Sequence, residues 1–158
     1  MPAQSVLDKA LQLLAARSRT ALELERALDR AGYSQPERES ALARLRELGY
    51  INDRETARTR ARLRVGQGDA PRLAARKLRT QGIADGEARA AAAGAADGAG
   101  EDELASRALN RRLRGRAPAN AREKQRLFRG LVAKGHRPSA AAKALGIEWE
   151  GNDEIEES

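Results

Sequence analysis

Residues 54–83 read RETARTRARLRVGQGDAPRLAARKLRTQGI, and this stretch decides how the whole sequence is interpreted. It ends in the pattern Leu78-Arg-Thr-Gln-Gly82-Ile83, which recurs as Leu28-Asp-Arg-Ala-Gly32-Tyr33 and as Leu131-Val-Ala-Lys-Gly135-His136. Copies about fifty residues apart are typical of modules that stack on their neighbours. We therefore predict a tandem repeat that forms an elongated, curved array, with residues 54–83 in its middle copy.

Composition and helix-start signals favour an all-α fold. Ala, Leu, Arg and Glu dominate the sequence, and they lose little side-chain freedom in a helix. Capping-box patterns begin at Ser5, Thr20 and Ser34, each with an acidic residue three positions on. We predict three tandem three-helix repeats at residues 1–53, 54–100 and 101–147. An acidic tail at 148–158 is expected to be disordered.

The repeat also predicts a core. Apolar residues that occupy equivalent positions in successive copies are expected to be buried: Leu24, Ala74 and Leu127; Leu28, Leu78 and Leu131; Leu42, Ala92 and Leu145. The third helix of the middle copy, residues 85–96, is rich in Ala, with seven in twelve residues. We expect it to bury little area and to be the least stable helix of the array.

Positive charge is concentrated in two blocks. Residues 54–83 hold nine Arg or Lys against Glu55 and Asp69, an excess that equals the formal net charge of +7. Residues 105–137 hold eleven against Glu123 alone. Such asymmetry indicates a polyanion such as nucleic acid, or an acidic protein surface. The alternative is a solvated surface whose arginines reflect a compositionally biased genome.

Arginines four apart on a helix, such as Arg58 and Arg62 or Arg60 and Arg64, lie one turn apart and can bridge phosphate oxygens. Aromatic stacking platforms are scarce, so we expect contacts to the backbone that depend little on base sequence. Sequence readout by a helix-turn-helix unit ranks lower. The candidate binding residues are Arg58, Arg60, Arg62, Arg64, Arg72, Arg76, Lys77, Arg79, Arg107, Arg111, Arg112, Arg114, Arg116, Arg122, Lys124, Arg126 and Arg129.

The residue inventory disfavours an enzyme. There is no Cys and only one His, His136, which we interpret as a local turn or a cation at a helix end. The sequence has no phosphate-binding loop motif, and no Ser/His/Asp or Cys/His set can be assembled. We expect no catalytic residue, no metal site and no cofactor. Without an apolar run of ~20 residues, we also expect a cytoplasmic protein with no membrane partner.

Three segments resemble the bacterial regulatory RecX family: Leu48-Gly-Tyr-Ile-Asn-Asp53, Arg62-Leu-Arg-Val-Gly-Gln-Gly68 and Leu78-Arg-Thr-Gln-Gly82-Ile83. The resemblance covers nearly the whole chain and is most specific at residues 20–83. It implies three tandem three-helix units. Within the repeat and family motifs we expect mainly structural roles for Gly32, Gly49, Tyr50, Asp53, Gly66, Leu78, Gly82, Ile83 and Gly135.

The same resemblance implies a function. Members modulate the recombinase RecA by lying in the groove of its filament on single-stranded DNA, where they limit ATP hydrolysis, strand exchange and LexA-directed coprotease activity. The implied partners are the RecA filament and single-stranded DNA through phosphate contacts, with double-stranded DNA as a further candidate. We expect a monomer. The alternative is a stand-alone DNA-binding protein without sequence preference.

Overall fold

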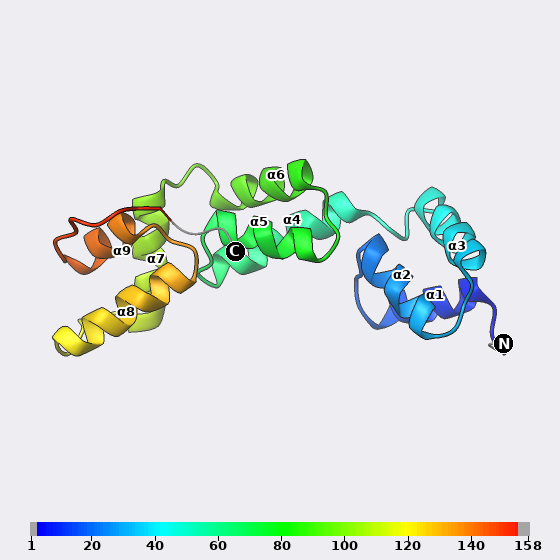
Figure 1. Cartoon of the computed structure of the whole chain (residues 1–158), viewed down its shortest axis with the longest axis horizontal. Helices are drawn as coiled ribbons and strands as arrows, with labels where there is room; N and C mark the ends of the chain where they lie inside the picture. The colour runs from blue at the N-terminus through cyan, green and yellow to red at the C-terminus, as the bar shows by residue number, and fades with distance from the viewer. Residues whose placement is uncertain (1–2, 155–158) are drawn as a thin grey trace.

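The computed structural model describes residues 3–154 of the chain. Within that range the regular structure is entirely helical, as Figure 1 shows. The helices are α1 (Val6–Ala16), α2 (Ala21–Arg30), α3 (Gln35–Glu47), α4 (Asp53–Gly66), α5 (Pro71–Thr80), α6 (Asp85–Ala96), α7 (Glu101–Leu113), α8 (Ala121–Ala133) and α9 (Pro138–Leu145). None of these helices is long and apolar enough to cross a membrane.

The helices form three groups of three, arranged in a row along the long axis of the molecule (Figure 1). Helices α1–α3, α4–α6 and α7–α9 each enclose a separate apolar cluster. This arrangement confirms the predicted all-α fold of three tandem three-helix repeats in an elongated array. Because each repeat has its own core, the contacts between repeats decide the shape of the whole.

The capping box predicted at Thr20 is present, and two other helix starts are capped by asparagine side chains. Thr20 Oγ1 accepts a hydrogen bond from Glu23 N at 3.1 Å, and Glu23 Oε2 accepts from Thr20 N at 3.0 Å. Asn52 and Asn120 accept from backbone N–H groups in the first turns of α4 and α8. These bonds satisfy donors that have no partner within the helix.

All the equivalent apolar positions predicted as core are buried, from Leu24 at 0% exposure to Leu127 at 7%. The residue that follows the turn glycine is buried in every repeat, namely Tyr33, Ile83 and His136. His136 lies in the turn after α8, as one of the two interpretations predicted, but its side chain is interior and its pKa is lowered, so the interpretation of it as a helix-end cation was wrong.

The alanine-rich helix α6 packs along both α4 and α5. Ala88, Ala91, Ala92 and Ala96 are all buried, and they face a cluster that is itself mostly alanine. Small side chains let the three backbones approach closely, so α6 gains its contacts from proximity more than from side-chain area. That it is the least stable helix remains a prediction.

The chain after α4 and the acidic tail each have a local feature that the repeat pattern does not predict. Helix α4 continues through Gly66, and the left-handed turn falls at Gly68, where φ is +103°. The first part of the expected disordered tail packs against the third repeat. The Trp149 ring centroid lies 5.3 Å from that of Phe128, and Asp153 accepts hydrogen bonds from Ser139 N at 2.9 Å and Ser139 Oγ at 2.6 Å. Residues 155–158 of the expected tail lie outside the described residues.

Neighbouring repeats meet at a glycine turn. A Cβ built on Gly82 would lie 2.5 Å from Leu22 Cβ, and one on Gly135 would lie 2.8 Å from Leu73 Cβ. Leu22 and Leu73 belong to the first turns of α2 and α5. The turn after the second helix of one repeat thus rests on the start of the second helix of the repeat before it. Gly32, which precedes both junctions, has open space around it.

Substitution of Gly82 by Ala should therefore destabilise the protein more than substitution of Gly32 by Ala. Both glycines have positive φ, at +93° and +91°, so each substitution carries the same backbone strain of about 1–2 kcal/mol. Only Gly82→Ala adds a clash with Leu22, and it should lower the free energy of unfolding by at least ~1 kcal/mol more. Urea unfolding of the two variants measures the difference, and equal losses would contradict the proposed docking contact.

Candidate nucleic-acid and protein interface

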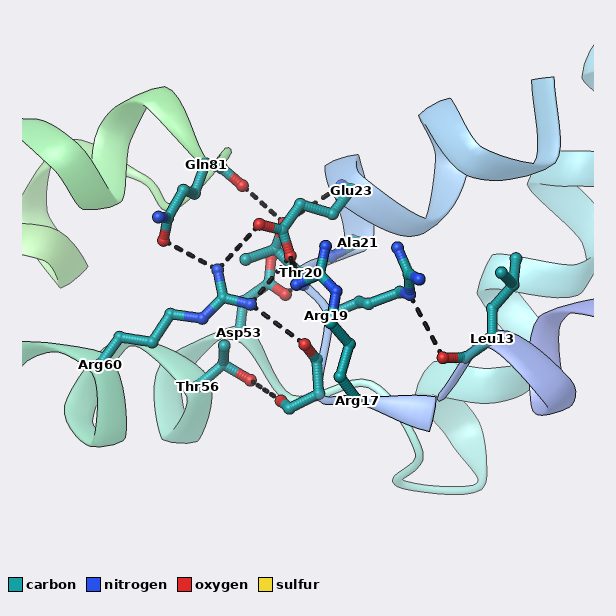
Figure 2. Close-up of polar contacts among 11 residues, drawn as sticks. Leu13, Arg17, Arg19, Thr20, Ala21, Glu23, Asp53, Thr56, Arg60 and Gln81 are labelled. Carbon is teal, nitrogen blue, oxygen red and sulfur yellow. Dashed lines mark hydrogen bonds and ion pairs between the residues drawn. The ribbon is translucent and has the colours of Figure 1, made fainter. Parts of the chain in front are cut away.

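The first junction, between the first and second repeats, is organised by Arg60 of α4 (Figure 2). Its Nη1 and Nη2 donate to the two Glu23 carboxylate oxygens, each at 2.9 Å. Nη1 also donates to Gln81 Oε1 at 2.8 Å, and Nη2 to the Ser18 carbonyl at 3.1 Å. The paired side chains are only 18% and 19% exposed. Arg60, which we had predicted to contact phosphate, is instead occupied within the protein.

Further bonds close the same junction. Thr20 Oγ1 donates to the Gln81 carbonyl at 2.5 Å, so the N-cap of α2 contacts the turn of the next repeat. Asp53 Oδ1 accepts from Ala21 N at 2.9 Å, and the Ser18 and Thr56 hydroxyls lie 3.3 Å apart (Figure 2). The backbone N–H of Ala21, at the start of α2, thus finds its partner in the following repeat.

Glu23 is ionised in this setting. Burial by itself raises the pKa of the Glu23 carboxyl, but the hydrogen bonds from Arg60 and from Thr20 N outweigh it. The net result is a pKa below the ordinary range. The Glu23–Arg60 contact is therefore a hydrogen-bonded ion pair, the strong class of polar contact.

The second junction, between the second and third repeats, is organised by Asp69, whose side chain is 3% exposed. Asp69 Oδ1 accepts from Lys134 Nζ at 3.1 Å, and Oδ2 accepts from Lys77 Nζ at 3.1 Å and Arg64 Nη1 at 3.4 Å. Burial raises the pKa of Asp69, yet the bonds from the two lysines outweigh it and leave the pKa lowered. Three cations around one carboxylate leave an excess of positive charge at this junction.

Backbone and histidine contacts complete the second junction. Ala70 N donates to the Lys134 carbonyl at 2.8 Å, and His136 Nε2 lies 2.8 Å from the Gly68 carbonyl oxygen. Arg72 Nε also donates to the Gly135 carbonyl. Burial lowers the pKa of His136 more than the hydrogen bond to Gly68 raises it. The imidazole is thus held neutral, as an N–H donor to the carbonyl.

The two arginine pairs predicted on α4 have different environments. Arg60 and Arg64 reach the first and second junctions, respectively. Arg58 and Arg62, on the alternate pair of positions, are exposed. Arg58 is 3.9 Å from Glu55, and no carboxylate of residues 3–154 lies within ion-pair distance of Arg62. One pair therefore joins repeats while the other faces solvent.

The remaining predicted cations divide in the same way. Arg79, Arg107 and Arg116 pair with Asp85, Glu103 and Glu123, and Arg126 lies 3.7 Å from Glu123. In the described part of the chain, no carboxylate comes within 4 Å of the others, which are Arg72, Arg76, Arg111, Arg112, Arg114, Arg122, Lys124 and Arg129. Arg72 bonds the Gly135 carbonyl at the second junction, so the rest of these side chains, with Arg62, are the predicted cations left to meet a partner.

One group of cations, both paired and unpaired, lies along α8 and just before it. Arg122, Arg126 and Arg129 line a hollow of about 580 Å³ together with Arg116 and Glu123. A hydrogen bond from Arg116, a second from Ala119 N and the nearby charges lower the pKa of Glu123 to about 2. The carboxylate stays charged, and the surrounding arginines outnumber it.

Most of the residues predicted to have structural roles lie in a core, at a junction or in a turn. Leu78 and Ile83 belong to the middle core, and Asp53 joins the first junction. Gly32, Gly49, Gly82 and Gly135 all have positive φ, whereas Tyr50 is 59% exposed.

Sequence reasoning missed Glu23, Gln81, Asp69 and Lys134 as junction residues. A signal existed for Asp69, which is one of two acidic residues among nine cations in residues 54–83.

The structure defines a class: an extended helical-repeat protein whose junctions are ionic and whose surface carries exposed cations on all three repeats. The family model for the RecX first three-helix domain matches residues 7–45. A regulatory protein RecX from Amycolatopsis mediterranei is 32% identical over 131 residues, covering 82% of this chain and 74% of that protein. The chain belongs to the RecX family of regulatory proteins.

Two further comparisons agree with that assignment. A regulatory protein RecX from Mycobacterium sp. (strain JLS) is 31% identical and covers 91% of this chain and 81% of its own length. The crystal structure of RecX from Lactobacillus salivarius superposes with a TM-score of 0.64 at 18% identity, covering 89% of this chain and 92% of that one. The structural likeness supports the fold.

A double-mutant cycle between Glu23→Gln and Arg60→Met should reveal strong coupling across the first junction. We expect a coupling free energy of about 1–2 kcal/mol in urea unfolding, because both side chains are mostly buried and doubly hydrogen-bonded. The matched cycle on Glu55 and Arg58, whose side chains are over half exposed, should give under ~0.5 kcal/mol. If the coupling free energy at the first junction were as small as that of the control pair, Arg60 would not contribute to holding the first two repeats together.

The second junction should weaken as pH falls through the range in which His136 titrates. Its folded pKa is lowered, so its contribution to stability is complete above the unfolded pKa of about 6.5 and is lost as pH falls through the folded value. The melting temperature should therefore drop between pH 7 and 5. His136→Gln, which keeps an N–H donor for Gly68, should flatten that drop. The lowered carboxyl pKa values of Asp69 and Glu23 place their losses at more acidic pH, below ~4.

Proposed function

We propose that this protein is a negative regulator of the recombinase RecA. In this proposal the row of repeats lies in the groove of the RecA filament on single-stranded DNA. Its occupancy limits ATP hydrolysis, strand exchange and LexA-directed coprotease activity. Membership of the RecX family is the first support for this function.

The observation that carries the proposal is the set of cations without a carboxylate partner in residues 3–154, which lie on α4, α5, α7 and α8 and at the end of α7. A groove lined by phosphates and by an acidic protein wall would pair with such a surface along its length. The two ionic junctions support it further, because a preformed elongated body loses less conformational entropy on binding than separate modules would. Regulation by occupancy needs no catalytic group, metal or cofactor.

The competing function is that of a stand-alone DNA-binding protein without sequence preference. Both functions predict that affinity for naked DNA falls steeply with salt, because phosphate contacts release counterions in either case. The two differ in the partner. A regulator acts on RecA at amounts too small to coat the DNA, whereas a competitor acts only when it saturates the DNA.

RecA-catalysed, single-strand-dependent ATP hydrolysis should fall when this protein is added well below the amount that coats the DNA. Replacing Arg58, Arg62, Arg111 and Arg114 by Ala should weaken that inhibition by about tenfold or more, because several charge contacts are removed together. The measurement is the ATPase rate against regulator concentration at fixed RecA and DNA.

A matched variant replaces four exposed arginines of the first repeat, Arg26, Arg30, Arg44 and Arg46, by Ala. It loses the same formal charge, so it should inhibit nearly as well as the unaltered protein if position matters. If inhibition were weakened equally in both variants, it would depend on net charge and not on the position of the arginines. No inhibition until the DNA is saturated would favour the stand-alone DNA-binding function.

A further inference from the structure

A cleft of about 550 Å³ lies between the end of α4 and the face of α7, where the second and third repeats meet. Leu104, Arg107, Ala108 and Arg111 line it from α7 at the i, i+3, i+4 and i+7 positions of one helix face. From the other side, Arg62, Val65 and Gly66 line it from one face of α4. Two repeats thus contribute to one site, which we call the α4–α7 cleft.

The cleft is cationic at its rim. Arg62 and Arg111 are exposed, and no carboxylate of residues 3–154 lies within ion-pair distance of either. Arg107 pairs with Glu103 and contributes little net charge. Asp69, which also lines the cleft, is surrounded by three cations and cannot offset the rim. The potential inside the cleft therefore favours an anion.

The floor of the cleft is apolar. Val65, Ala95, Leu104 and Ala108 line it, and Ala108 Cβ would lie 3.5 Å from a Cβ built on Gly68, so the two repeats are close beneath it. A free phosphate ion would use only the rim. A nucleotide unit has both parts that this site matches, because a flat apolar base can cover the floor while the flanking phosphates meet the arginines.

We propose that the α4–α7 cleft receives one or two nucleotides of single-stranded DNA, with a base on the apolar floor and phosphates at Arg62 and Arg111. In a duplex the bases are stacked and paired, so the same insertion would first require unpairing. The cleft therefore gives this protein a preference for single strands over duplexes. The inference rests on the proposed function only in that both include a single-stranded DNA partner.

Fluorescence anisotropy with a labelled oligo-dT and with a duplex of equal length tests the proposal. Arg62→Gln with Arg111→Gln should weaken oligo-dT binding and reduce the slope of log affinity against log salt by about 1.4, the value for two single-strand phosphate contacts. The matched control is Arg26→Gln with Arg46→Gln, which removes the same charge from the first repeat and should leave that slope unchanged.

Ala95→Leu tests the floor without changing charge. Ala95 is partly buried at the edge of the middle core, so the longer side chain projects into the cleft. It should weaken oligo-dT binding about fivefold or more while duplex binding stays the same. A thermal melt checks that the variant folds. In a second, independent measurement, a photoreactive thiothymidine oligonucleotide should crosslink the unaltered protein at α4 or α7.

Crosslinks confined to other elements, an unchanged salt slope in the Arg62 and Arg111 variant, or equal loss of duplex and oligo-dT binding in Ala95→Leu would each overturn the proposal. If the Arg62 and Arg111 variant bound oligo-dT normally but no longer inhibited RecA, the cleft would bind an acidic protein segment instead. If the cleft binds oligo-dT as expected but the unaltered protein never inhibits RecA, the proposed function fails while the site stands.

Discussion

The shape of this protein depends on how three separate cores are joined. Each repeat buries its own apolar cluster, and what links neighbours is a glycine turn resting on a helix start, closed by buried ionic contacts. A buried carboxylate is costly unless it is paired and hydrogen-bonded. Glu23 obtains its partner Arg60 from the second repeat, and Asp69 obtains Lys134 from the third. The junctions therefore favour one mutual arrangement, because any other would cost Glu23 its hydrogen bonds from Arg60 and Asp69 its hydrogen bond from Lys134.

This constraint divides the positive charge into two populations. Arg60 and Arg64 are one helical turn apart on α4 and reach the two junctions, whereas Arg58 and Arg62 alternate with them in sequence and face solvent. Helix α4 thus contributes arginines both to the junctions between repeats and to the exposed cationic surface. Binding at the α4–α7 cleft would also span the second junction, so a ligand there would add to the contacts that hold the last two repeats together.

Much of the fold could be predicted because it is local. Thr20 with Glu23 marks a helix start through backbone bonds made within three residues, and Gly82 marks a turn because its φ is positive. The repeat pattern then predicted the core, because Leu28, Leu78 and Leu131 occupy equivalent positions in successive repeats. The burial of His136 was not predicted, although Tyr33 and Ile83 hold the equivalent buried position in the other repeats.

By itself the sequence determined the all-helical repeat, its core and the two cationic blocks, because periodicity, capping and composition are properties of neighbouring residues. Only the tertiary structure decided which cations are internal. Arg60 and Arg62 are two positions apart and look alike in the sequence, yet one bonds Glu23, 37 residues away, and the other lines a cleft with Arg111. The physical reason is that ion pairing depends on distance in space. That distance is set by the docking of whole repeats, which no local pattern encodes.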